Sequence, residues 1–109
     1  MISDPQVTFR DIDPSPALTE YVLDRAKKLD ALHSRITACH VVVEAPHRHH
    51  HHGRHYRIRV NLTVPGGDLV TGTRGDDERV HEDAYAAIDD AFDEAQRVLR
   101  DFVQRQRGY

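Results

Sequence analysis

The segment Tyr56–Val64 alternates without a break between apolar and polar side chains, and this pattern limits the fold more than any other stretch of the chain. Its apolar side comprises Tyr56, Ile58, Val60, Leu62 and Val64. Its polar side comprises Arg57, Arg59, Asn61 and Thr63. A repeat of two residues is that of a β-strand with one apolar and one wet face. The sheet that contains this strand must therefore bury one face against another layer of secondary structure.

Three further segments have strand patterns, and their expected bounds are Gln6–Ile12, Ile36–Ala45 and Leu69–Arg74. In the second of them, β-branched residues dominate and the polarity again alternates. Its core side is expected to hold Cys39, Val41 and Val43, opposite His40 and Glu44. The segment Pro65–Asp68 contains two glycines and predicts the turn before the last strand.

Two segments have the spacing of amphipathic helices. The first is expected from Pro16 to about Leu32, because Ser15 is a suitable N-cap and proline is tolerated in a first turn. Its apolar stripe consists of Leu18, Val22, Ala26 and Leu29. The second is expected from about Arg79 to Arg105, with acids in its first half and arginines in its last, as the helix dipole favours. Its apolar arc consists of Ala84, Ala87, Ile88, Ala91, Ala95, Leu99 and Phe102.

The predicted order of elements is β-α-β-β-β-α, without an internal repeat. Because each strand has one apolar face, we expect an α+β sandwich with both helices packed on one face of a four-stranded sheet. A chain of 109 residues corresponds to a single domain, residues 1–109. The segment 46–55 is an insertion between the second and third strands.

Charge is segregated along the chain, so the net charge of −3 says little about partners. The segment His47–Arg59 contains four arginines, six histidines and no acid, whereas Asp76–Glu94 contains nine acids and one arginine. The single cysteine, Cys39, excludes a disulfide-stapled module and is expected to be an inert core thiol. No apolar run approaches the roughly 18 residues of a membrane span, and the start lacks a signal-peptide layout. We therefore expect a cytoplasmic protein that does not enter a membrane.

Two segments resemble a known family. DAYAAIDDAFDEAQRVLRDFVQRQRG (Asp83–Gly108) is similar to the second helix of the ribosome hibernation-promoting factor / ribosome-associated inhibitor A family, also called the sigma-54 modulation protein family. That helix is marked by a D-x-Y-A-A-I-D start and a basic end. ALTEYVLDRAKKLDALHSRI (Ala17–Ile36) is similar to the family's first helix and the start of its second strand. The order of elements agrees along nearly the whole chain. The histidine-rich loop resembles that of a short branch of the family.

The resemblance implies a protein that binds the small ribosomal subunit, on free 30S particles and in 70S ribosomes, under stress or in stationary phase. Such proteins occupy the channel for messenger and transfer RNA and so regulate translation. Carried over by position, the family's basic residues fall on Arg25, Lys28, Arg97, Arg105 and Arg107, and Arg100 adds a base where the family varies. Arg54, Arg57 and Arg59, at the base of the hairpin, are expected to add a further anchor. These nine residues are the candidate contacts to phosphates of 16S rRNA.

The sequence departs from the family pattern in its second helix, which is often more basic in the family. Here Glu94 and Asp101 stand at positions where a lysine would be unsurprising. The chain also ends without the dimerising tail of the family's long form, so ribosome dimerisation by this chain alone is not expected. Its own oligomeric state, monomer or weak dimer, is left open.

The same residues allow other interpretations. The arginines of the second helix could form a solvated face, with Asp93–Arg97 and Asp101–Arg105 as intrahelical pairs. The histidine loop could hold a metal ion, which would make the chain a metal-binding or metal-sensing protein. Its candidate ligands would be His47, His49, His50, His51, His52 and His55. The histidine run could also be a purification tag, but tags are placed at chain termini, whereas this run lies between two predicted strands. No catalytic triad, nucleotide loop or paired carboxylate is evident, so we expect neither an enzyme nor a cofactor.

The third interpretation of the loop, as an RNA-facing basic segment, predicts a pH effect. The six histidines of His47–Arg59 would add positive charge to its four arginines as they protonate near a pH of about 6.5. Affinity for 30S subunits, measured by cosedimentation at constant salt, is expected to rise as the pH falls from about 8 to 6. Equal affinity at the two pH values would contradict this interpretation.

Overall fold

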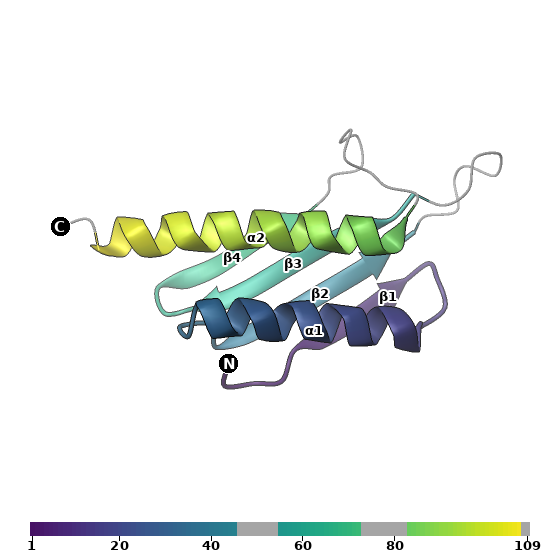
Figure 1. Ribbon diagram of the computed structural model, residues 1–109, viewed down its shortest axis with the longest axis horizontal. Helices are drawn as coiled ribbons and strands as arrows, with labels where there is room; N and C mark the ends of the chain where they lie inside the picture. The colour runs from purple at the N-terminus through teal and green to yellow at the C-terminus, as the bar shows by residue number, and fades with distance from the viewer. Residues whose placement is uncertain (46–54, 73–82, 108–109) are drawn as a thin grey trace.

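The computed structural model describes residues 1–45, 55–72 and 83–107. Within these ranges the elements are β1 (Gln6–Arg10), α1 (Pro16–Leu32), β2 (Ala38–Glu44), β3 (Arg57–Val64), β4 (Gly67–Gly72) and α2 (Ala84–Arg107). The four strands form one sheet, and both helices lie side by side across one of its faces (Figure 1). The predicted α+β architecture and the order β-α-β-β-β-α are confirmed.

The sheet has the strand order β1-β2-β3-β4. Strand β1 pairs with β2 in parallel, with Val7 opposite Val41, because α1 carries the chain back across the sheet between them. Strands β2, β3 and β4 follow as an antiparallel meander, in which Val41 lies opposite Val60. This register aligns the apolar positions of neighbouring strands on the face that the helices cover.

The core lies between that face and the two helices. The predicted inward residues of β2 are buried, as are all four residues of the predicted stripe on α1. On β3 the predicted inward residues from Ile58 to Val64 are buried, whereas Tyr56, just before the strand, is only partly buried. On α2 the predicted arc is buried from Ala84 to Leu99, whereas Phe102 is partly exposed. Phe92, which the predicted arc omits, is buried with an exposed fraction of 1% and faces α1 as well as the sheet. The core is apolar: among the described residues, no polar or charged residue is fully buried.

Helix α2 begins at Ala84, whereas the prediction placed its start at about Arg79. Asp83, which the prediction included in the helix, lies just before it, and residues 79–82 lie outside the described part. Asp83 caps the helix: its carbonyl accepts from the Ala87 N–H at 3.0 Å, and its carboxylate accepts from the Tyr85 N–H at 2.9 Å. A side chain that satisfies a free N–H of the first turn defines a helix start more strongly than propensity does. The helix continues two residues beyond the predicted end, to Arg107.

The boundaries of the strands also differ from the prediction. Strand β2 spans Ala38–Glu44 rather than Ile36–Ala45, and β3 begins at Arg57 rather than Tyr56. Strand β1 ends at Arg10 rather than Ile12, because Asp11 has a φ of 61° and turns the chain out of the extended conformation. Strand β4 begins at Gly67 rather than Leu69, since Pro65 and Gly66 alone form the turn. Gly66 has a φ of 99°, as the third position of a type II turn requires. Residues 73–74, in the predicted last strand, lie outside the described part.

The core packing predicts a large effect at Ile88, which is fully buried. Ile88→Ala is expected to lower the free energy of unfolding by about 2–5 kcal/mol, because it removes buried methyl groups and leaves a cavity. Chemical denaturation followed by circular dichroism measures the change. Leu32→Ala is the matched control, since Leu32 is 62% exposed at the end of α1, and it is expected to change stability by less than about 0.5 kcal/mol. Equal losses in the two variants would contradict the described core.

Candidate nucleic-acid interface

The structure describes eight of the nine candidate phosphate contacts and distributes these eight over two opposite faces. Arg25 and Lys28 lie on α1, and the four arginines of the second helix lie on α2, all in the helical layer. Arg57 and Arg59 alternate with buried residues of β3 and therefore project from the face of the sheet away from the helices. Arg54 lies outside the described residues. The candidates do not form a single patch.

Arg25 is engaged within the protein. Its Nη2 lies 2.9 Å from Oδ1 of Asp93, and its Nη1 lies 3.6 Å from Oδ1 of Asp89. Its guanidinium also lies over the ring of Phe92, 5.7 Å from the centroid. With its side chain only 23% exposed, Arg25 links α1 to α2, and two carboxylates offset its charge.

Tyr21 strengthens the same link between the helices. Its hydroxyl donates to Oδ1 of Asp89 at 2.6 Å, and its ring meets the ring of Tyr85 edge-on, with centroids 5.0 Å apart. The hydrogen bond to the Asp89 carboxylate, aided by desolvation and by the negative charge of that carboxylate, raises the pKa of Tyr21 above its ordinary value of 10.0. Asp89 therefore accepts from Tyr21 and pairs with Arg25 at once.

Lys28 and Arg97 are exposed and have weak partners on their own helices. Lys28 Nζ lies 3.2 Å from Asp24, one turn earlier, and Arg97 lies 3.6 Å from Glu94 and 3.9 Å from Asp101. Exposed pairs of this kind contribute little free energy and are screened by salt. The intrahelical pairing differs from the expected scheme, because Asp93 is drawn to Arg25 on the other helix and Asp101 pairs with Arg97.

Arg100, Arg105 and Arg107 are exposed on the last two turns of α2. None of the three has an ion-pair partner within the described ranges. Positive charges at a helix C-terminus are favoured by the helix dipole, which stabilises this arrangement without acidic partners. These side chains are thus available to an external anion.

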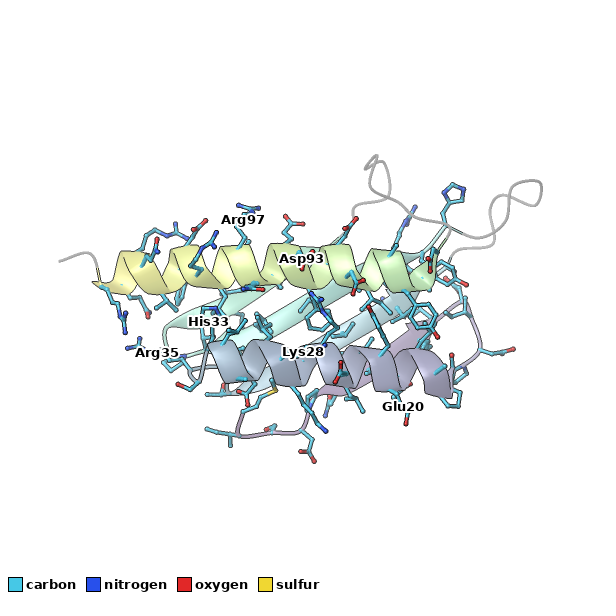
Figure 2. All side chains as sticks on the ribbon, viewed as in Figure 1. Glu20, Lys28, His33, Arg35, Asp93 and Arg97 are labelled. Atoms are coloured by element: carbon cyan, nitrogen blue, oxygen red, sulfur yellow. The ribbon has the colours of Figure 1, made fainter. Side chains whose placement is uncertain are left out.

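Arg35 joins this group, although the prediction omitted it. It lies in the connection between α1 and β2, and its Nη1 donates to Oε1 of Gln106 at 3.3 Å. Figure 2 shows Arg35 beside the C-terminal end of α2. We call Arg35, Arg100, Arg105 and Arg107 the cationic end. Arg35 and Gln106 are 71 positions apart in the sequence, so no local sequence signal indicates this contact.

Gln106 holds the end of α2 in place from two sides. Besides accepting from Arg35, its Nε2 donates to the carbonyl of Pro65 in the turn between β3 and β4, at 3.2 Å. A Cβ at Gly66 would lie 2.6 Å from that Nε2 and would displace the Gln106 amide, and the φ of 99° at Gly66 also favours glycine there. Two loops and the last helical turn therefore meet at one side chain, which fixes the direction of the cationic end.

The outer face of the sheet carries a smaller set of charges. Arg57 lies 3.8 Å from Glu44 on the neighbouring strand, whereas Arg59 is exposed opposite Gly72, which has no side chain to cover it. Thr8 and His40 share a hydrogen bond of 2.7 Å between Oγ1 and Nε2 on the same face. Of the two arginines of β3 on this face, Arg59 is the more exposed.

The candidate metal ligands His47, His49, His50, His51 and His52 lie outside the described residues, and only His55 of that set is described. Across 1–45, 55–72 and 83–107, no three histidine, cysteine or acidic side chains are close enough together to hold a metal ion. Cys39 is buried, and desolvation raises the pKa of its thiol to about 11, as expected of an unreactive core thiol.

Comparison with known proteins agrees with this fold. The family model described as sigma 54 modulation protein / S30EA ribosomal protein matches residues 6–107. The chain belongs to this family. In the part of the chain that the structure describes, no helix is long and apolar enough to cross a membrane.

Two relatives in this family are similar over most of the chain. A ribosome hibernation promotion factor of Deinococcus radiodurans is 33% identical over 108 residues, which cover 94% of this chain but 53% of that protein. This chain thus spans about half the length of that relative. A ribosome hibernation promoting factor of Pseudomonas putida is 24% identical over 102 residues, covering 94% of this chain and 88% of that protein.

Two solved structures have the same fold. A ribosomal subunit interface protein from Coxiella burnetii superposes with a TM-score of 0.72 at 17% identity, over 90% of this chain and 94% of that one. The N-terminal domain of Protein Y from Thermus thermophilus superposes with a TM-score of 0.69 at 22% identity, over 89% and 94% of the two chains.

The link between the helices makes a prediction about pH. Because the folded-state pKa of Tyr21 is raised, the hydrogen bond to Asp89 contributes stability below a pH of about 10 and loses it as the pH rises through the raised pKa. Ultraviolet titration of phenolate absorbance, compared between the wild type and Tyr21→Phe, isolates this ionisation. Asp89→Asn is expected to return the pKa of Tyr21 towards its ordinary value. A pKa of Tyr21 at or below its ordinary value of 10.0 in the wild type would contradict the assignment.

Proposed function

We propose that this chain is a ribosome-associated translational regulator. In this proposal it binds the 30S subunit through phosphates of 16S rRNA and occupies the channel for messenger and transfer RNA. Its family membership and the names of its relatives support the association with ribosomes. The observation that carries the proposal is the cationic end, where exposed arginines without acidic partners gather at one end of the helical layer.

Physical chemistry favours phosphate as the ligand of the cationic end. Arginine presents a planar fork of donors that matches a phosphate, and its charge persists at any physiological pH. Among the candidates on the two helices, Arg100, Arg105 and Arg107 are open, whereas Arg25 already has two carboxylate partners. We therefore assign direct phosphate contact to the cationic end and to Lys28, and assign Arg25 to holding the two helices together.

The proposal also assigns RNA contact to the arginines on the outer face of the sheet. A protein that occupies a channel is contacted from more than one side, and Arg57 and Arg59 would meet RNA across the sheet from the helices. Few aromatic side chains accompany these cations, which favours recognition of the shape and backbone of folded RNA. The proposal assigns no chemical step to the chain and no cofactor, and its setting would be the cytoplasm.

The alternative, a metal-binding or metal-sensing protein, rests on the histidine loop. Most of that loop lies outside the described residues, and no observation within them favours it. We therefore develop the ribosomal proposal alone.

The test is cosedimentation of the purified chain with 30S and 70S particles across a series of salt concentrations. The combined variant Arg100→Ala, Arg105→Ala and Arg107→Ala is expected to weaken binding and to reduce the slope of log affinity against log salt by about 2–3, or roughly 0.7–0.9 for each lost phosphate contact. Arg97→Ala is expected to have a smaller effect, since Glu94 and Asp101 already offset its charge.

Gln104→Ala is the neutral control for that experiment, because Gln104 is exposed on the same helix. It is expected to bind like the wild type. Absence of wild-type binding at low salt would refute the ribosomal proposal, and an unchanged salt slope in the combined variant would refute the role of the cationic end. Competition with transfer RNA for the 30S subunit tests occupation of the channel.

A further inference from the structure

A groove with a volume of about 190 Å³ opens between α1 and α2, and the proposed phosphate contacts leave its interior unused. It is lined by Arg25, Lys28, Leu29, Leu32, Phe92, Asp93 and Gln96. Figure 2 shows Lys28 on α1 and Asp93 on α2, one on each side of the groove. Its volume is below the roughly 300–1,000 Å³ of pockets for drug-sized ligands, so it suits a smaller group.

The floor of the groove is apolar and firmly held. Leu29 and Phe92 are almost fully buried beneath it, and the guanidinium of Arg25 lies over the Phe92 ring. Leu32, the last residue of α1, leaves 62% of its surface exposed at the rim. The groove therefore offers the apolar side chain of Leu32 and the guanidinium of Arg25, against which a planar group can pack.

The polar groups of the groove favour a neutral ligand. The charge of Arg25 is offset by Asp89 and Asp93, so the floor has no free cation for an anion. Gln96 is half-buried in the wall, and among the described residues its amide has no hydrogen-bond partner. An unpaired amide that both donates and accepts is suited to the hydrogen-bonding edge of a planar ligand.

Cations flank this neutral interior. Lys28 stands on the α1 side, 69% exposed, and Arg100 follows Gln96 by one helical turn on α2. A nucleic acid whose phosphates lie on these cations would present a base to the groove between them. The groove is thus continuous with the surface that the proposed function assigns to RNA.

We infer that the groove holds one unpaired RNA base, an inference that rests on the proposed function and adds a base contact to it. The base would stack on Leu32 and the guanidinium of Arg25, with its edge at Gln96 and Asp93. Glutamine pairs well with the amino group and ring nitrogen of adenine, and aspartate accepts from the amino group of cytosine. The groove therefore prefers a base with an exocyclic amino group to uracil.

The salt dependence of binding separates this contact from a phosphate contact. Gln96→Ala and Leu32→Ala are each expected to weaken 30S binding about tenfold, the size expected for loss of one well-made base contact. Because the lost contact is uncharged, the slope of log affinity against log salt is expected to stay at the wild-type value. Gln104→Ala and Val70→Ala are the matched controls, since both residues are exposed outside the groove.

Two outcomes of that experiment would overturn the inference while leaving the proposed function intact. One is wild-type affinity in both groove variants, and the other is a reduced salt slope in them. If the wild type itself fails to bind the subunit, the proposed function and the groove inference fail together. This result is recognised because every variant and control then also fails to bind.

A second measurement tests the base directly. Nuclear magnetic resonance titration of the chain with tetra-adenylate is expected to shift the amide signals of Leu29, Leu32 and Gln96, with smaller shifts from tetra-uridylate. Gln96→Ala is expected to abolish the difference between the two. Equal shifts from the two oligonucleotides would overturn the base preference. Weakened 30S binding in the groove variants without any shift from either oligonucleotide would indicate a ribosomal protein as the occupant and would overturn the inference.

Discussion

The ion pairs of Arg25 with Asp89 and Asp93 join the two helices, and the arrangement of the helical layer depends on them. The sheet provides a common apolar surface for α1 and α2, and the ion pairs add directional contacts between the helices to this non-directional burial. Together with the hydrogen bond from the Tyr21 hydroxyl to Asp89, these ion pairs hold one turn of α1 against two successive turns of α2. Both the groove and the separation of Lys28 from the cationic end follow from this alignment.

The elements and their inward faces could be predicted from the sequence because period-two and helical spacings are local properties. Cys39, Val41 and Val43 are buried as predicted, for that reason. The start of α2 could not be predicted from helical spacing, because the cap formed by Asp83 sets it. The partners of Arg25 were also beyond prediction, because Asp93 is 68 residues away and meets it only once both helices are packed.

The candidate interface shows the same division between local and long-range information. The basic end of α2 can be recognised in the sequence from its arginines, and the resemblance to the family predicts a ribosomal partner for it. What the sequence could not supply is which cations are free: pairing removes Arg25, and the fold adds Arg35 through Gln106. The choice among cations is therefore a property of the packed structure, and of the helix-to-helix contacts in particular.

Leu99 is the last fully buried residue of α2, and the helix continues for eight more residues to Arg107 (Figure 1). These two turns touch the rest of the protein mainly through Phe102, Val103 and Gln106. Substitutions at the exposed positions between them can therefore alter charge at almost no cost to folding. Single substitutions that add or remove one arginine can thus change the positive charge of this helix in small evolutionary steps, while the fold stays the same.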